Sequence, residues 1–222
     1  MQELLKTFFL TRRDIQEALV KNDLKYCYDV IETLISQNTD IPKALVSAFT
    51  LILIESGIDP LSCLDKIYPH MYSGIDYIDE VIIPSNIKSI GDWAFYNCSG
   101  LKSITIPDSV TSIGYGAIYA CTSLTNIDIP NSVTSIGASA FRRCEGLTNI
   151  IIPDGVKAIK VGAFYGCKKL KSVEIPDSVR IIGYTVFEEC PKLKDVTIPK
   201  RFMSSLNEIF GEHQLEINFN FI

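Results

Sequence analysis

The chain has 222 residues, of which 47% are hydrophobic and 21% charged, so it can bury a core and is not expected to be disordered. Its formal net charge of −5 disfavours a nucleic-acid-binding protein, because such proteins carry a basic surface. The longest apolar run, residues 44–54, is too short to span a bilayer, and no signal-peptide cleavage site follows the N-terminus. We therefore expect a cytoplasmic protein without membrane association.

The first part of the chain shows helical patterns. Thr11 suits the N-cap of a helix over residues 12–20, and residues 23–36 place apolar side chains at helical spacing. Pro42 suits the first turn of a third helix that runs to about Glu55. We therefore predict three or four helices in this part of the chain.

Asp59 and Pro60 open a shorter helical segment, and no trace of a repeat precedes about Gly74. We predict a helical N-terminal domain over residues 1–74. This domain serves as a cap for the repeats that follow, as a cap with a recognition surface, or as a domain with an activity of its own.

The sequence over residues 75–199 repeats with a constant period and without an insertion. The Ile-Pro pairs that mark the repeat begin at Ile83, Ile106, Ile129, Ile152, Ile175 and Ile198. A fixed period in the twenties is typical of a solenoid, in which each coil buries its apolar side against its neighbours. We therefore predict a solenoid domain over residues 75–199.

Each repeat contains the same succession of short segments. Residues 124–129 alternate as a strand, which Pro130 ends because proline cannot donate a ladder hydrogen bond. A second extended piece follows, and residues 138–144 are expected to form a turn of helix. Three sets of apolar residues recur at fixed positions and should stack in the core: Leu101, Leu124, Leu147, Leu170 and Leu193; Phe95, Ile118, Phe141, Phe164 and Phe187; Ala94, Ala117, Ala140, Ala163 and Val186.

Glycine recurs at another position of the repeat, as Gly91, Gly114, Gly137 and Gly183. We expect this position to need a positive φ, which a residue without Cβ adopts readily. Lys160 holds the position in one coil, so we expect strain there and a gain in thermal stability from Lys160→Gly.

The pattern LxxIxIPxxVxxIGxxAFxxC, which covers residues 77–199, resembles the leucine-rich repeats of the BspA-like family. The resemblance implies a curved solenoid with a parallel β-sheet on one side. The fold class is then an α+β repeat protein: a small α-helical N-terminal domain, a leucine-rich-repeat solenoid and a C-terminal cap. Known members of the family are mostly binding proteins, often on cell surfaces, and the family pattern carries no catalytic residues.

Residues 200–222 depart from the repeat. Residues 200–210 have a helical pattern, and residues 215–222 alternate as a final strand. The simplest interpretation is a C-terminal cap that covers the last coil.

Five of the seven cysteines form a ladder with the period of the repeat: Cys98, Cys121, Cys144, Cys167 and Cys190. Metal ligation and a chain of disulfides are the functional interpretations, and buried thiols are the structural one. We favour buried thiols, because zinc ligands usually come in close pairs and the ladder has none. Cys27 and Cys63 have no evident partner. We predict no metal site and no disulfide.

The sequence contains no recognisable catalytic group. Its two histidines, His70 and His213, lie on opposite flanks of the repeats, and no nucleophile, phosphate-binding or dinucleotide motif is present. The carboxylates show no paired arrangement that would suit acid–base catalysis. We predict a protein that is not an enzyme and needs no cofactor.

The outward positions of the predicted strands form a candidate binding face. They are Glu80, Ile82, Ser103, Thr105, Asn126, Asp128, Asn149, Ile151, Ser172, Glu174, Asp195 and Thr197. Four are acidic and none is basic, which suits a protein partner with basic groups and disfavours nucleic acid. The alternative is a polar sheet that is only solvated.

The variable positions of the expected helical turns form a second candidate face, the predicted helical edge. They are Trp93, Tyr96, Tyr115, Tyr119, Arg142, Arg143, Tyr165 and Tyr184. Tryptophan, tyrosine and arginine are enriched where proteins bind one another. The alternative is that these side chains only cover the edge of the coil.

These observations together predict a non-enzymatic protein–protein interaction module that presents a rigid solenoid surface to a protein partner. An inhibitor or adaptor, including one of virus or phage origin, is one form of that role. The first alternative is a cell-surface adhesin of the BspA-like type. The second is an effector whose activity lies in the helical domain.

Overall fold

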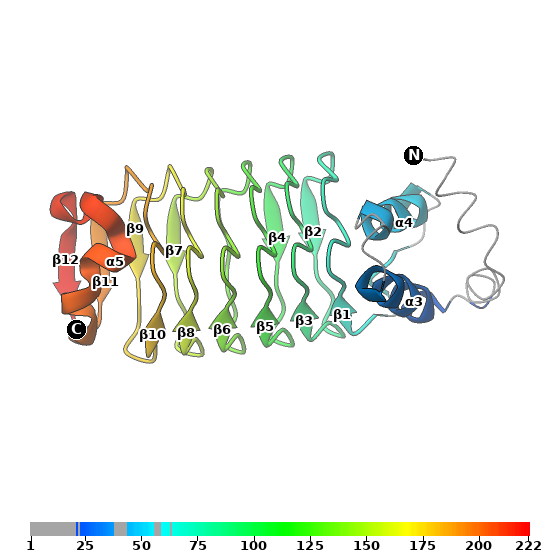
Figure 1. The fold of residues 1–222 in the computed structure, drawn as a ribbon, viewed down its shortest axis with the longest axis horizontal. Helices are drawn as coiled ribbons and strands as arrows, with labels where there is room; N and C mark the ends of the chain where they lie inside the picture. Colours follow the sequence, from blue (N-terminus) through cyan, green and yellow to red (C-terminus); the bar gives the residue numbers. More distant parts are fainter. Residues whose placement is uncertain (1–20, 22, 38–43, 56–58, 63) are drawn as a thin grey trace.

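The computed structural model describes residue 21 and residues 23–37, 44–55, 59–62 and 64–222 (Figure 1). The expected helix over residues 12–20 with its Thr11 cap lies outside the described residues, as do Pro42 and Cys63. Two helices, α3 (Leu24–Gln37) and α4 (Ala44–Glu55), stand at one end of a long stack of coils. Among the helices described, none has the length and apolarity needed to cross a membrane.

The coils form a parallel β-solenoid with two sides, and each coil adds a strand to at least one of them. This confirms the predicted solenoid fold. The first side is one six-stranded parallel sheet. Its strands are β1 (Lys66–Ile67), β3 (Ser89–Ile90), β5 (Ser112–Ile113), β6 (Ser135–Ile136), β8 (Ala158–Ile159) and β10 (Ile181–Ile182). Ser89 pairs with Ser112 and Ser112 with Ser135, so one repeat of the sequence is one coil. The Thr111 hydroxyl donates to the Lys88 carbonyl, 23 residues earlier, at 3.3 Å, which is the same period.

The second side, which we call the sheet face, is divided into a two-stranded and a four-stranded sheet. The two-stranded sheet consists of β2 (Glu80–Ile82) and β4 (Ser103–Thr105). The four-stranded sheet consists of β7 (Asn149–Ile151), β9 (Ser172–Glu174), β11 (Asp195–Ile198) and β12 (Asn218–Phe221). All of these strands pair in parallel.

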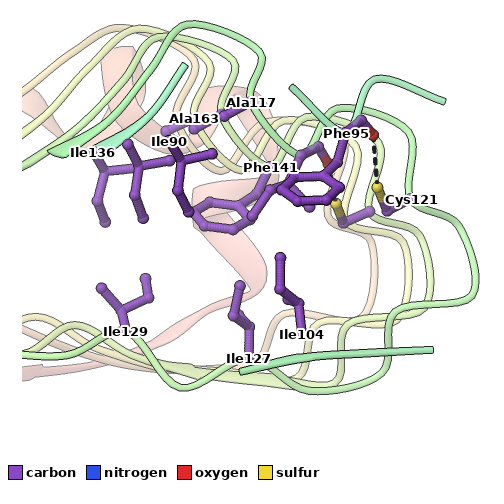
Figure 2. Close-up of a cluster of buried hydrophobic side chains, with 14 of the residues drawn as sticks. Ile90, Phe95, Ile104, Ala117, Cys121, Ile127, Ile129, Ile136, Phe141 and Ala163 are labelled. Carbon is purple, nitrogen blue, oxygen red and sulfur yellow. Dashed lines mark hydrogen bonds between the residues drawn. The ribbon is translucent and has the colours of Figure 1, made fainter. Parts of the chain in front are cut away.

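The core lies between the two sides and is built from the predicted ladders. Figure 2 shows Phe95 and Phe141 between isoleucines of the first side and Ile104 and Ile127 of the sheet face. The ring of Phe164 stacks on Phe141, with centroids 5.1 Å apart and planes within 5°. Stacked aromatic rings bury a large apolar area, so this spine ties each coil to the next.

Both ends of the solenoid are divergent coils. Lys66 and Ile67 of β1 pair with β3, and Tyr72 stacks on Phe95 with centroids 4.9 Å apart. The expectation that no repeat precedes Gly74 is therefore wrong. Tyr68 stands at the glycine position of this coil and Tyr72 at its phenylalanine position, so the sequence pattern does not detect the coil. At Asp59 the chain makes a turn rather than the expected short helix.

The C-terminal segment also follows the repeat. The ring of Phe210 stacks on that of Phe187, its equivalent in the preceding coil, with centroids 5.3 Å apart. The expected helical segment forms as η1 (Lys200–Ser205) and α5 (Leu206–Phe210), followed by η2 (Gly211–Glu216) and the expected strand, β12. The cap is thus a last coil in which helical segments take the place of the strand of the first side.

Helix α3 covers the first coil, and it fits the helix expected over residues 23–36. The ring of Tyr28 stacks on Tyr68 with centroids 5.1 Å apart, and the Tyr68 hydroxyl donates to the Asp29 carboxylate. Lys25 forms an ion pair with Asp65 at 3.6 Å. These contacts give the first coil a neighbour, as a solenoid end requires.

The expected turns of helix are not helical. We call residues 92–97 and their equivalents in later coils the turn edge. The amide N–H groups of Trp93, Phe95 and Asn97 donate to the carbonyls of Tyr115, Ala117 and Tyr119 in the next coil, at 2.8, 2.7 and 2.8 Å. The amides between them bond locally, Ala94 to the Gly91 carbonyl at 3.3 Å and Tyr96 to the Trp93 carbonyl at 3.1 Å. Alternate amides thus bond to the next coil and to the preceding turn, where an α-helix would direct every amide to the carbonyl four residues earlier.

Two positions per coil of the turn edge have a positive φ. In one coil they are Trp93 and Asn97, both with φ of 58°. Glycine fills these positions in some coils, as at Gly116 and Gly166, but most hold other residues, including Ala120 with φ of 58°. Residues with a Cβ are strained in this conformation, so the hydrogen bonds between coils must maintain it.

The glycine position of the repeat has a different cause from the one expected. Neither the four glycines nor Lys160 has a positive φ, so the predicted strain at Lys160 is wrong. Instead, a Cβ on Gly91 would lie 2.5 Å from the Ile67 carbonyl oxygen, and one on Gly183 would lie 2.5 Å from the Val161 nitrogen. Glycine is used at these coils because the neighbouring backbone approaches closely, whereas Lys160 carries a Cβ at the same position of its own coil.

The cysteine ladder consists of buried thiols, as predicted. Each thiol can donate to a carbonyl 26 residues earlier: Cys98 to Tyr72 at 3.0 Å, and Cys144 to Ile118 at 2.9 Å. The five cysteines of the ladder are free thiols, and no cluster of metal-ligating groups occurs among the described residues. Burial raises the pKa of Cys144 to about 12 and also raises that of Cys167.

A matched pair of glycine substitutions tests the backbone assignments. Ala120→Gly should raise the free energy of unfolding by up to about 1 kcal/mol, because it relieves a positive-φ alanine. Lys160→Gly should lower it by about 0.5–1 kcal/mol, because glycine adds freedom to the unfolded chain without relieving strain. Urea unfolding of both variants measures the difference; a more stable Lys160→Gly protein would contradict it.

The raised thiol pKa predicts a loss of stability in alkali. Unfolded thiols lose their protons near pH 9.0, whereas Cys144 in the folded protein keeps its proton up to about pH 12. The folded state then binds more protons, so the free energy of unfolding should fall between these values by up to about 1.4 kcal/mol per pH unit for such a group. Below pH 9 the contribution is fully present.

Cys144→Ala removes this group and should make the pH dependence less steep over the same range. The free energy of unfolding, measured at several pH values for both proteins, gives the two slopes. Equal slopes would show that the Cys144 thiol titrates normally in the folded protein.

Candidate functional site

The structure places the predicted outward residues on the sheet face. Ten of the twelve are exposed, and the other two, Ser172 and Thr197, are half-buried. Strands β2, β4 and β7 alternate exposed, buried, exposed, so their middle residues anchor the strand in the core. The outward side chains are therefore available for contact without disturbing the packing.

The sheet face is acidic. Glu80, Asp128 and Glu174 take part in no ion pair among the described residues, and Asp195 accepts a hydrogen bond from Asn218 at 3.3 Å. The face itself presents no lysine or arginine among the twelve positions. Its carboxylates would attract a partner with basic groups.

The lysines beside the sheet face change this charge little. Lys102 forms an ion pair with Asp79 at 3.4 Å, and Lys194 forms one with Glu216 at 2.8 Å. Lys171 is exposed beside the face. Two of these three cations are thus already neutralised by neighbours outside the twelve face positions.

Two large apolar side chains interrupt the polar sheet face. Ile82 on β2 and Ile151 on β7 are each 67% exposed. A partner that covered them would gain about 25 cal/mol for each Å² of apolar surface removed from water. They are the main apolar groups that this face offers to a partner.

The sheet face is broken near its middle. Residues 126–129 form no strand, and a single isolated bridge between Thr105 and Asp128 joins them to β4. Strand β7 is the edge of the four-stranded sheet. A hollow of about 300 Å³ lies at this break, lined by Asn126, Ile127, Asp128, Ile129, Asn149, Ile151 and Pro153.

The turn edge brings together several of the aromatic residues predicted for the second face. The Trp93 ring lies 4.7 Å from that of Tyr115, 5.3 Å from Tyr96 and 5.7 Å from Tyr119. Gly116 lies directly under Trp93, where any Cβ would clash with the indole. Tyr96 and Tyr115 remain exposed, so the cluster forms an aromatic surface.

The remaining residues of the second face lie further along the turn edge. The Arg142 guanidinium covers the Tyr165 ring at 3.8 Å from its centroid, which is a cation–π contact. Tyr184 is 62% exposed, and Arg143 is exposed at φ of 58°. The structure therefore separates the predicted face into an aromatic cluster and a second group with two arginines.

A larger hollow, of about 650 Å³, lies near the C-terminal end and was not predicted. Its lining includes four acidic residues: Glu188, Glu189, Glu208 and Glu212. They come from two segments of the chain that the last coil brings together. The only sequence signal is that Glu189 and Glu212 hold equivalent positions in successive coils.

Comparison with known proteins identifies the repeats. The sequence profile of the BspA type leucine rich repeat region matches residues 65–159 and 135–221, with six copies. This match begins before Gly74 and ends after Pro199, so it includes both divergent coils. A search of curated proteins finds no match.

Among solved structures, a leucine rich repeat protein of T. pallidum is 30% identical, with a TM-score of 0.55 over 59% of this chain and 62% of that one. A leucine rich cell surface protein of Faecalibacterium prausnitzii is 33% identical, with a TM-score of 0.47 over 60% of this chain and 42% of that one. The pneumococcal vaccine antigen PcpA is 24% identical, with a TM-score of 0.49 over 60% of this chain and 33% of its own.

The chain thus spans less than two thirds of the length of each of these proteins. The profile match, by contrast, covers well over half of the chain and agrees with the coil register seen in the structure. The chain belongs to the BspA type leucine-rich-repeat family.

Proposed function

We propose that this protein is a non-enzymatic interaction module that binds a protein partner through its sheet face. Leucine-rich-repeat solenoids commonly bind proteins or form part of surface proteins, and such repeats are generally not enzymes. The observation that carries the proposal is the pair of isoleucines on an otherwise polar face. Ile82 and Ile151 are 67% exposed although they occupy strand positions where polar residues stand in other coils.

The solenoid suits this role because its surface is ordered before binding. Stacked rings and hydrogen bonds between coils fix the backbone on which the outward side chains stand. A partner then loses little free energy to ordering this surface. The acidic side chains on the face would favour a partner that carries lysine or arginine.

The turn edge is the second candidate surface, and the Trp93 cluster is the observation in its favour. Exposed tyrosine and tryptophan supply large contact areas at protein interfaces. A cell-surface adhesin and an inhibitor or adaptor are both forms that a binding module can take. The cytoplasmic location expected from the sequence stays a prediction.

Capture of a partner followed by affinity measurement tests the proposal. Full-length protein would capture partners from lysate of the source cells, and binding of the captured protein would then be measured for each variant. The Ile82→Thr/Ile151→Thr double variant should weaken binding by about thirtyfold, because each change removes about 1 kcal/mol of apolar burial. Threonine keeps the preference for strand structure.

A matched variant on the other surface serves as the control. Tyr115→Ser/Tyr184→Ser changes two exposed side chains of the turn edge and should leave binding unchanged. The opposite result, in which the tyrosine variant loses the partner and the isoleucine variant keeps it, would move the binding surface to the turn edge. Thermal melts of both variants would show that each is folded.

A further inference from the structure

We propose that the hollow at the break in the sheet face binds an arginine side chain of the protein partner. This inference rests on the proposed function and specifies the chemistry that the face recognises. The hollow of about 300 Å³ is at the small end of the range for ligand sites, which suits one long side chain.

The polar groups of the hollow are rich in acceptors. The Asp128 carboxylate lines it and takes part in no ion pair among the described residues. The amide of Asn149 is held in place, because its oxygen accepts from the Ser172 hydroxyl at 2.9 Å and its nitrogen donates to Thr148 at 3.3 Å. Asn126 adds a second amide.

The break in the sheet explains why such a hollow exists here. Asparagine and aspartate are poor strand formers, and Asn126 and Asp128 hold the two outward positions of residues 126–129. These residues pair with β4 only at the Thr105–Asp128 bridge and form no strand with β7. The opening between neighbouring coils lets a side chain enter between Asp128 and Ile151.

The walls suit the rest of an arginine side chain. Ile151 is two-thirds exposed at the rim, and Pro153 lies beside it in the lining. The methylene groups of arginine can lie along such apolar surface while the guanidinium reaches the acceptors. A bound anion would be repelled by the carboxylate, and a metal ion would find a single carboxylate ligand.

Arginine fits better than lysine for a geometric reason. A guanidinium presents five N–H donors in a planar fork, so it can bind a carboxylate with two of them and an amide oxygen with another. An ammonium group is a compact point charge that gains less from several acceptors around an open hollow. We therefore expect selectivity for arginine over lysine.

Titration with a small probe tests the site directly. The probe is N-acetyl-L-arginine amide, added to isotope-labelled full-length protein and followed by NMR. Saturable shift changes are expected at the amides of residues 126–129 and 149–151. The lysine analogue should bind several-fold more weakly, and the glutamine analogue should produce no saturable change.

Two isosteric variants sharpen the test. Asp128→Asn should weaken binding of the arginine probe at least tenfold, whereas Asp108→Asn, an exposed aspartate outside the hollow, should leave it unchanged. Shifts that scatter over the surface, or that persist in Asp128→Asn, would overturn the site. Equal binding of the lysine and arginine probes would overturn the selectivity.

The outcome can be separated from that of the proposed function. A partner that Asp128→Asn still binds fully, but that Ile82→Thr/Ile151→Thr loses, would keep the protein-binding role and overturn the arginine site. Arginine-probe binding at residues 126–129 without any protein partner on the sheet face would support an arginine site but overturn the proposed protein-binding role. Loss of the partner in both variants is the result that we expect.

Discussion

The hydrogen bonds between coils are the constraint on which the rest of this structure depends. Backbone groups at matching positions of successive coils bond to one another along the first side, along the turn edge, and along the sheet face on either side of its break at residues 126–129. Every residue therefore lies above its own equivalent in the preceding coil. A side chain that packs well in one coil meets the same side chain in the next, which favours one residue type at each inward position.

The same constraint explains the unusual features of the backbone. Neighbouring coils approach so closely at Gly91 that no Cβ fits beside the Ile67 carbonyl. At the turn edge, alternate amides point to the next coil, and this arrangement needs a positive φ even where the residue is Trp93 or Ala120. The strain of one coil is thus compensated by bonds to another, which no local sequence rule describes.

Features set by residues within one coil could be predicted from the sequence, whereas features set by bonds between coils could not. The core ladders and most strands of residues 77–199 could be predicted, because inward residues such as Phe141 and Phe164 repeat with the period of the coil. The strand predicted over residues 124–129 is wrong, since only an isolated bridge at Asp128 forms there. The first coil could not, because Tyr68 and Tyr72 replace its marker residues. The helix predicted for the turn edge is wrong, since the conformation there depends on bonds between coils. The positions of the outward residues could be read from strand alternation, but the hollow at Asp128 depends on pairing that is lost between coils.

The fixed register between coils also sets the spacing of the outward side chains on the sheet face. Its outward groups can be spaced along the solenoid axis only in multiples of one strand separation, about 4.8 Å. Ile82 and Ile151 stand three coils apart, which corresponds to roughly 14 Å at the spacing of paired strands, and the break at residues 126–129 lies between them. Duplication or deletion of one repeat unit between them would change this distance by a whole step while leaving each coil intact. The specificity of such a surface can change through the number of repeats alone, without substitution of any contact residue.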